Sequence, residues 1–219
     1  MMTVNQIIGN LPNQICANFG KRLFSWMMAQ NSGTYDKIVS ERKRSLFANL
    51  QGKVLEIGPI TGTNLPYYPK DIQWIGIEPN PHMHSYLQKQ AQKLNLNIDL
   101  RMGNAEWLDA EDNSIDSVVS TLALCSVPNI DYTLQAILRV LKPGGRFLFI
   151  EDVAAPQGTV LRQLQRTISP IWKVIGDGCH PDRKTWIALE NAGFASVNYE
   201  RFDAQLPIAS PHIIGVATK

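Results

Sequence analysis

The sequence predicts a single α/β domain built on a doubly wound parallel sheet. Short apolar segments alternate with stretches of helical periodicity between residues 54 and 150, which is the pattern of successive strand and helix units. A glycine turn, Gly58 to Gly62, follows the first apolar segment, and such turns bind ligands at the carboxyl ends of strands. The length of 219 residues suits one sizeable core and is short for two.

Composition excludes several classes of protein. The net charge is +2 and the longest run of like charge is Arg42 to Arg44, so we expect no nucleic-acid partner. The three cysteines, Cys16, Cys125 and Cys179, are far apart and odd in number, which argues against a disulfide framework and favours a reducing, cytoplasmic location. No apolar run reaches the roughly 18 to 20 residues that span a bilayer, and no signal-peptide pattern is visible.

Residues 1–50 are predicted to form a helical cap before the first strand. An apolar stripe of helical spacing contains Phe19, Leu23, Trp26 and Met27. We interpret it as a helix that packs over the core or covers the pocket, and the alternative is a weak contact with a membrane surface. A break is expected at residues 31–33, followed by a second helix at 35–50 whose Tyr35 could cover a bound cofactor.

The first strand is predicted at residues 54–57, where apolar residues surround Glu56 without strict alternation. Gly58 and Gly62 then permit a sharp turn and a close approach of the backbone to a ligand. Only a short helix is expected at 65–68, because Pro66 and Pro69 limit its length.

The second strand is predicted at residues 73–77 and ends at Glu78. This acid lies 20 positions beyond Gly58, an offset at which a carboxylate reaches ribose hydroxyls. The alternative is a charge at a helix start, because Asn80 is a good N-cap and Pro81 a good first residue for a helix at 81–94.

The next units repeat this pattern and place polar residues at strand ends. Strands are predicted at 98–102, before Asn104, and at 115–121, before Cys125. A helix follows and is stopped by the Lys-Pro-Gly-Gly sequence at 142–145, and a fifth strand at 146–150 closes with Glu151 and Asp152. Because parallel strands end at one edge of a sheet, these side chains are expected to share one pocket with Glu56 and Glu78.

The last third of the chain departs from simple alternation. A helix at 160–175 is expected to be interrupted at Pro170, Asp182 is expected to cap a helix at 183–192, and strands follow at 195–202 and 213–218. The turn at 176–180 carries Cys179 and His180. Adjacent residues rarely converge on one atom and no ligand quartet is visible, so the sequence predicts no metal site.

Several motifs support a resemblance to a known family. An acid followed by x-G-x-x-x-G, here EIGPITG, resembles motif I of the class I S-adenosylmethionine-dependent methyltransferases. The stretches IEPNPHM, STLALCSV, RVLKPGG, GDGCH and PHIIGVATK resemble the methyltransferase-like 7 family, whose animal members are thiol S-methyltransferases. The chain departs from motif I at Ile60, where the class I methyltransferases usually have glycine, and from the animal proteins at Asp152, where they have histidine. We do not expect the hydrophobic membrane leader of the animal proteins in this sequence.

The resemblance implies a seven-stranded sheet whose last strand is antiparallel and inserted beside the fifth. It implies S-adenosylmethionine as cofactor, a methyltransferase domain at 51–219, and an acceptor pocket covered by residues 1–50 and about 155–182. The predicted catalytic residues are His180 and Asp152. The predicted cofactor-binding residues are Tyr35, Glu56, Gly58, Gly62, Asn64, Glu78, Pro79, Asn104, Ala105, Leu122 and Cys125.

The implied function is methyl transfer to a small-molecule nucleophile, with a thiol as the first hypothesis. A thiol needs little help from a base, because its pKa of about 8.5 leaves some thiolate near neutral pH. An alcohol would need a base, for which Asp152 and His180 are the candidates. The alternatives are an O- or N-methyltransferase of a small metabolite and, because of Ile60, a cofactor-binding module without catalysis.

Overall fold

The computed structural model describes the backbone of residues 4–219 and the side chains of residues 20–30 and 33–219. Seven strands form one sheet in the order β3-β2-β1-β4-β5-β7-β6. Strands β1 to β5 are parallel, and β7 runs antiparallel between β5 and β6. The predicted doubly wound sheet with an inserted antiparallel last strand is therefore confirmed. The strands are β1 Lys53–Ile57, β2 Gln73–Ile77, β3 Asp99–Arg101, β4 Ile115–Thr121, β5 Leu141–Asp152, β6 Ser196–Asp203 and β7 Pro211–Thr218.

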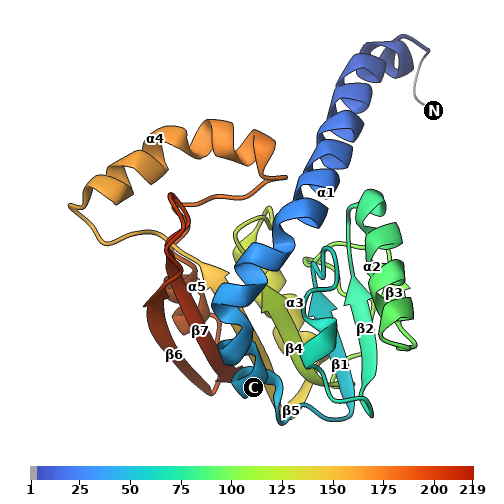
Figure 1. Ribbon diagram of the computed structural model, residues 1–219, viewed down its shortest axis with the longest axis vertical. Coiled ribbons are helices and arrows are strands. Elements are labelled where there is room, and N and C mark those ends of the chain that lie inside the picture. The colour runs from blue at the N-terminus through green and yellow to red at the C-terminus, as the bar shows by residue number, and fades with distance from the viewer. Residues whose placement is uncertain (1–3) are drawn as a thin grey trace.

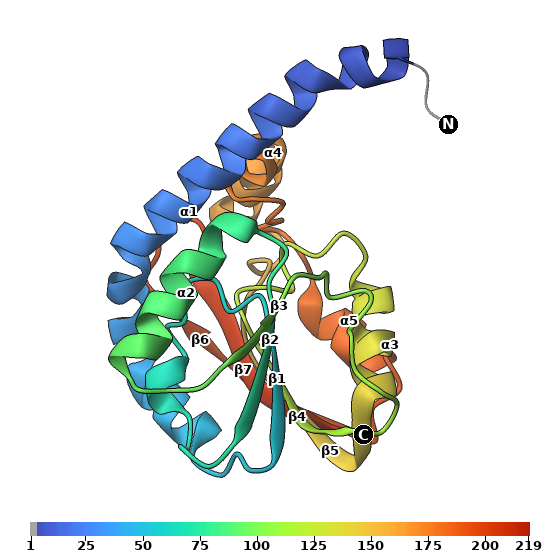
Figure 2. The same ribbon diagram turned by 90° about the vertical axis from the view of Figure 1, so that its right-hand side faces the viewer.

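Helices cover both faces of the sheet (Figure 2). The carboxyl-terminal half of α1 and helix α2 lie on one face, and α3 and α5 lie on the other. Successive strand residues alternate between the two cores: Val54 packs with Phe47 of α1, while Leu55 packs with Leu134 of α3. This two-sided burial explains the continuous apolar strands of the sequence. The helical segments are α1 Val4–Phe47, η1 Leu65–Tyr67, α2 Pro81–Lys93, α3 Ile130–Val140, α4 Val160–Ile175 and α5 Thr185–Asn191.

Helix α1 is continuous, so the predicted break at residues 31–33 is wrong. Its backbone runs without interruption from Val4 to Phe47. Glycine inside a helix costs only about 1 kcal/mol relative to alanine, and added atoms at Gly33 would meet nothing within 4 Å. The cost is small beside the packing of the helix end, where Val39, Lys43 and Phe47 are completely buried.

Three further boundaries differ from prediction. Helix α4 continues through Pro170, which lies on a segment that projects beyond the sheet, where water can satisfy the carbonyl that proline leaves unpaired (Figure 1). Asp182 does not cap α5, because α5 begins after Lys184 and the Asp182 carboxylate instead accepts a hydrogen bond from Ser169. Strand β5 begins at Leu141, and its register against β4 shifts between Ile115 and Ser117 to absorb the Lys-Pro-Gly-Gly sequence.

Candidate functional site

A pocket of about 250 Å³ opens at the carboxyl ends of the parallel strands, as the sequence predicts. Helix α1 crosses this end of the sheet and contributes Lys21 and Phe24 to the wall (Figure 1). The turn after α4 contributes Asp177. The other lining residues are Ile57, Gly58, Ile60, Ile77, Glu78, Pro79, Met83, Asn104, Ala105, Leu122, Ala123, Ser126, Val127 and Pro128.

Six of the eleven predicted cofactor-binding residues line this pocket, namely Gly58, Glu78, Pro79, Asn104, Ala105 and Leu122. Gly58 has a φ of +59°, and a Cβ there would lie 2.9 Å from the Cβ of Ala123. Only glycine therefore fits where the loops after β1 and β4 approach each other. Gly62 also has a positive φ, but it packs against Leu65 and Leu87 and does not line the pocket.

Ile60 lines the pocket in a left-handed conformation, with a φ of +51°. This conformation is rare for β-branched residues and costs roughly 1 to 2 kcal/mol. It is fixed by a hydrogen bond from the Ile60 amide to Glu78 Oε2 at 3.1 Å. The sequence identified the position as unusual because glycine is expected there, and the backbone has the conformation that glycine would favour.

Glu78 is the buried acid of the pocket. Its second oxygen accepts a hydrogen bond from the Asn80 amide at 2.8 Å, so the carboxylate joins the turns after β1 and β2. Burial raises the pKa of Glu78 to about 7, against two backbone hydrogen bonds that favour the ionised form. A nearby Asp177 raises the pKa further, and Lys21 lowers it. The carboxylate lines the pocket at the end of β2, and its contact with a ribose stays a prediction.

Asn80 connects the segments that cover the pocket. Its side-chain oxygen accepts from the His82 amide at the start of α2, as an N-cap does. Its side-chain nitrogen donates to the carbonyl of Lys21 in α1 and to Asp177, each at 3.2 Å. Sequence reasoning recognised the cap but missed this second role, because the partners are 59 and 97 residues away.

Glu56 and Asn64 do not line the pocket, so the structure gives no support to their predicted contact with the cofactor. Glu56 is fully buried and accepts hydrogen bonds from Asn64, Tyr68 and Trp74 at 2.7 to 2.9 Å. Burial raises the pKa of Glu56, and these donors oppose the rise. Both residues therefore stabilise the inner side of the glycine turn.

A second group of polar residues lies beside the pocket, behind the loop that follows β4. The Cys125 thiol, the Asp152 carboxylate and the Cys179 thiol each place an atom within 4.8 Å of the other two. Both thiols are free. The ring of Tyr35 stacks on His212 at 5.6 Å between centroids, and His212 is paired with Asp152 across β5 and β7. Tyr35, Cys125 and Asp152 therefore belong to this second group and do not line the pocket.

Asp152 and Glu151 end the same strand in different surroundings. Glu151 accepts hydrogen bonds from the Ser120 hydroxyl and from the Leu124 amide, and burial raises its pKa to about 8. One oxygen of Asp152 has no hydrogen-bond partner within the part of the chain that the structure describes, and the Cys179 thiol lies 3.8 Å from the other. Burial also raises the pKa of Asp152.

His180 is held beside this group by its backbone. Its amide donates to the carbonyl of Cys125 at 2.9 Å, and its half-buried ring does not line the pocket. Burial lowers the pKa of His180, and the charges of Arg183 and Lys173 lower it further.

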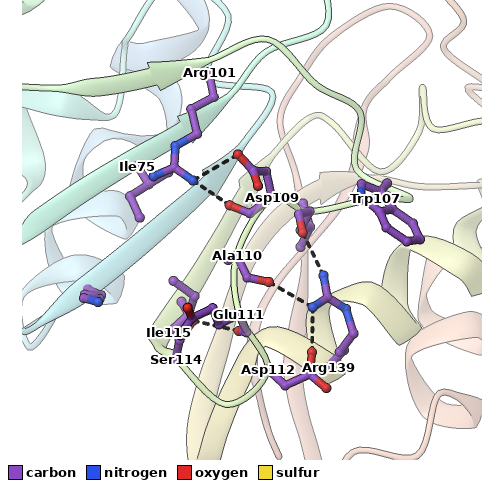
Figure 3. Close-up of a pocket in the computed structure, with 12 residues that line it drawn as sticks. Ile75, Arg101, Trp107, Asp109, Ala110, Glu111, Asp112, Ser114, Ile115 and Arg139 are labelled. Atoms are coloured by element: carbon purple, nitrogen blue, oxygen red, sulfur yellow. Dashed lines mark hydrogen bonds and ion pairs between the residues drawn. The ribbon is translucent and has the colours of Figure 1, made fainter.

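A separate cavity of about 780 Å³ lies near the amino-terminal ends of β1 and β4 (Figure 3). Its two arginines are engaged with neighbouring groups: Arg101 bonds to Asp109, and Arg139 bonds to Asp112 and to the carbonyl of Ala110. These bonds anchor the loop before β4. The glycine turn and the loops after β1, β2 and β4 do not line this cavity, so we assign the functional site to the smaller pocket.

The chain is similar to known methyltransferases. A family model described as a methyltransferase domain matches residues 55–149. Human thiol S-methyltransferase TMT1A is 35% identical over 212 residues, covering 91% of this chain and 87% of that protein. Human thiol S-methyltransferase TMT1B is 36% identical over 213 residues with the same coverage.

Two solved structures share the fold. The [4+2]-cyclase SpnF has a TM-score of 0.65 at 18% identity and covers 85% of this chain and 79% of its own. The second is a protein from Methanococcus maripaludis described as a putative S-adenosyl-L-methionine-dependent methyltransferase. It has a TM-score of 0.62 at 19% identity, and the match covers 89% of this chain and 91% of that protein.

Proposed function

We propose, from the premise that this chain belongs to the family of the thiol S-methyltransferases TMT1A and TMT1B, that it transfers the methyl group of S-adenosylmethionine to a small thiol. The observation that carries the proposal is an identity of 35% or more across 91% of the chain, which includes the acceptor side as well as the cofactor side.

The pocket residues fit the cofactor. Glu78 presents a buried carboxylate at the end of β2, where it can accept hydrogen bonds from two ribose hydroxyls. Apolar side chains such as Ile77, Met83 and Val127 provide walls for a purine ring. Asn104 offers an amide, although its oxygen already accepts from the Trp107 amide at 3.0 Å. Bound S-adenosylmethionine would supply a methyl group activated by a positively charged sulfur.

The protein contributes orientation and exclusion of water. The acceptor sulfur forms a bond to the methyl carbon while the bond from that carbon to the sulfonium breaks, with its electron pair remaining on the cofactor sulfur. This displacement requires an in-line arrangement and little proton transfer. Lys21 and Phe24 on α1, with Asp177 on the turn after α4, cover the pocket from two sides and would restrict water.

We assign the acceptor's proton to His180 or to water, because His180 lies next to the polar group behind the pocket. Asp152 remains the candidate base for an alcohol, and methylation at oxygen or nitrogen remains the alternative reaction. A module that binds cofactor without catalysis is the third hypothesis, and it rests on Ile60.

We interpret α1 as a lid over the pocket. The face it turns to the pocket carries Lys21 and Phe24, whereas Leu23, Trp26 and Met27 are 39 to 55% exposed, so the predicted stripe is not the covering face. Phe19 lies outside the described side chains. Within residues 4–219, no helix has the length and apolar character that a membrane span requires. The exposed stripe supports a weak contact with a membrane surface as the second role of α1, and we propose a cytoplasmic location.

The test is a direct assay of the purified full chain. Calorimetric titration should detect binding of S-adenosylmethionine, and mass spectrometry should detect the methyl thioether formed from a small apolar thiol. A phenol and a primary amine of similar size to the thiol serve as control acceptors for methylation at oxygen and at nitrogen. Methylation of either in preference to every thiol tried would replace the thiol assignment, and cofactor binding without any product would favour the non-catalytic hypothesis.

A further inference from the structure

Two thiols and a carboxylate converge behind the pocket from three distant segments. Cys125 follows β4, Asp152 ends β5, and Cys179 lies in the turn after α4. One ligand atom from each lies within 4.8 Å of the other two. Cys125 and Asp152 are each 3% exposed, and Cys179 is half-buried.

The backbone around this group is fixed by other contacts. The His180 amide bonds to the Cys125 carbonyl at 2.9 Å, which ties the two cysteine-bearing loops together. Arg183 donates to the carbonyls of Leu124 and Val127 on either side of Cys125, at 2.5 and 2.7 Å. The two loops that carry the cysteines are therefore held together by contacts that do not involve the thiols.

The carboxylate of Asp152 lacks the donors that a buried carboxylate needs. Among the described residues, one oxygen has no hydrogen-bond partner, and the other has the Cys179 thiol at 3.8 Å, while the Cys125 thiol also favours the ionised carboxylate. Its neighbour Glu151 is bonded to a hydroxyl and a backbone amide. Burying an unsatisfied carboxylate is costly, and a bound cation would compensate for it.

We propose that Cys125, Asp152 and Cys179 form a binding site for Zn²⁺. Thiolates select zinc over magnesium and calcium, and zinc accepts a carboxylate as a third ligand. Zn–S bonds of about 2.3 Å and Zn–O bonds of about 2.1 Å place tetrahedral ligands about 3.6 to 3.8 Å apart. The Cys179 and Asp152 atoms already have that separation, and the whole group needs to contract by about 1 Å.

Three protein ligands leave the fourth position of the metal open, which is the arrangement of catalytic zinc sites. Among the described residues, His212 does not belong to the group formed by Cys125, Asp152 and Cys179, so we do not assign it as a fourth ligand. Ser126 and Asp177, which line the cofactor pocket, are one and two residues from the cysteine ligands. The open position therefore suits the acceptor thiol: its sulfur would bind the metal, its S–H bond would break, and the proton would pass to solvent. This role rests on the proposed function, whereas metal binding does not.

The test uses Co²⁺ as a spectroscopic substitute for Zn²⁺. The full chain carrying Cys16→Ser, so that only two thiols remain, is freed of metal, kept reduced with a phosphine and titrated with Co²⁺. We expect one equivalent to produce near-ultraviolet sulfur-to-cobalt charge transfer and visible tetrahedral bands, both removed by Zn²⁺. Cys125→Ser and Cys179→Ser should each lose about half of the charge-transfer intensity, and Asp152→Asn should weaken Co²⁺ binding at least tenfold.

A parent spectrum without charge transfer at excess Co²⁺ would overturn the site, and this result does not depend on whether the variants fold. A spectrum unchanged by Cys179→Ser would also overturn it. For the acceptor role, benzyl mercaptan added to the Co²⁺ form should increase the charge-transfer intensity by about half, as a third sulfur binds. An unchanged spectrum would overturn that role. Thiol binding to cobalt without any methyl transfer would instead count against the proposed function.

Discussion

The raised pKa of Glu78 predicts that cofactor affinity depends on pH. A carboxyl with a pKa of about 7 is roughly one-tenth ionised at pH 6 and nine-tenths ionised at pH 8. Only the ionised form accepts hydrogen bonds from both ribose hydroxyls. Binding should therefore be about tenfold tighter at pH 8 than at pH 6, which corresponds to about 1.4 kcal/mol.

The assay should use a ligand without a titratable amine. 5′-Methylthioadenosine retains the adenine and ribose of the cofactor and does not change charge between pH 6 and pH 8. Its dissociation constant is measured by calorimetry at both values with the parent and with Glu78→Gln. The variant should bind more weakly at pH 8 and should lose the pH dependence. Glu111→Gln, which removes the same charge from an exposed loop residue, is the matched control.

The Glu78 carboxyl also makes the stability of the protein depend on pH, and here the effect of raising the pH is unfavourable, whereas for cofactor binding it is favourable. Because its pKa is raised from 4.5 to about 7 by folding, the folded protein binds more protons between these values, and its stability should fall as pH rises through that window. The contribution is at most about 3 kcal/mol, or several degrees in Tm for a chain of this length. Glu78→Gln should flatten that part of the Tm profile. Equal affinity at pH 6 and pH 8 in the parent, or pH dependence retained in the variant, would refute the assignment of Glu78.

Three further predictions follow from the pocket and its cover. Ile60→Gly should be more stable than Ile60→Ala by about 1 kcal/mol in thermal unfolding, because only glycine escapes the cost of the left-handed φ; the reverse order would contradict that backbone conformation. His180→Ala should lower kcat/KM for a thiol roughly tenfold with cofactor Kd unchanged, and an unchanged rate would remove His180 from the mechanism. Deleting residues 1–30 should slow turnover because Lys21 and Phe24 are lost from the pocket, whereas Leu23→Ser with Trp26→Ser should leave turnover unchanged. Strong vesicle binding by the parent that this double variant abolishes would assign the stripe to lipid contact.

Local signals in the sequence predicted the parallel strands and the polar residues at their carboxyl ends, whereas the inserted antiparallel strand was expected only from the resemblance to a known family. Alternating strands and helices, the glycine turn, and Glu78 at its offset from Gly58 all depend on residues close together in the chain. The local rules failed where tertiary packing outweighs them. Gly33 sits inside a helix because the end of α1 is anchored in the core, and Pro170 is tolerated in an exposed helix.

The group of two thiols and a carboxylate could not be predicted from spacing. The sequence argued against a metal because Cys179 and His180 are adjacent and no ligand quartet is visible. The structure instead joins Cys125, Asp152 and Cys179, which are 27 residues or more apart. The cues in the sequence were the placement of Cys125 and Asp152 at strand ends. Nothing local indicated that the turn after α4 would fold back onto them, since that contact depends on Arg183 and on the His180 amide.

The place of β7 in the sheet has a consequence for how the protein is made. Strand β5 is buried along most of its length, yet its neighbour β7 is separated from it by the whole of α4, α5 and β6. A nascent chain that has reached residue 200 would therefore present β5 as an unpaired edge, and such edges recruit other strands. The inserted strand makes residues 211–218 the closing step of assembly, so a ribosome-bound chain would remain vulnerable to aggregation until these residues emerge.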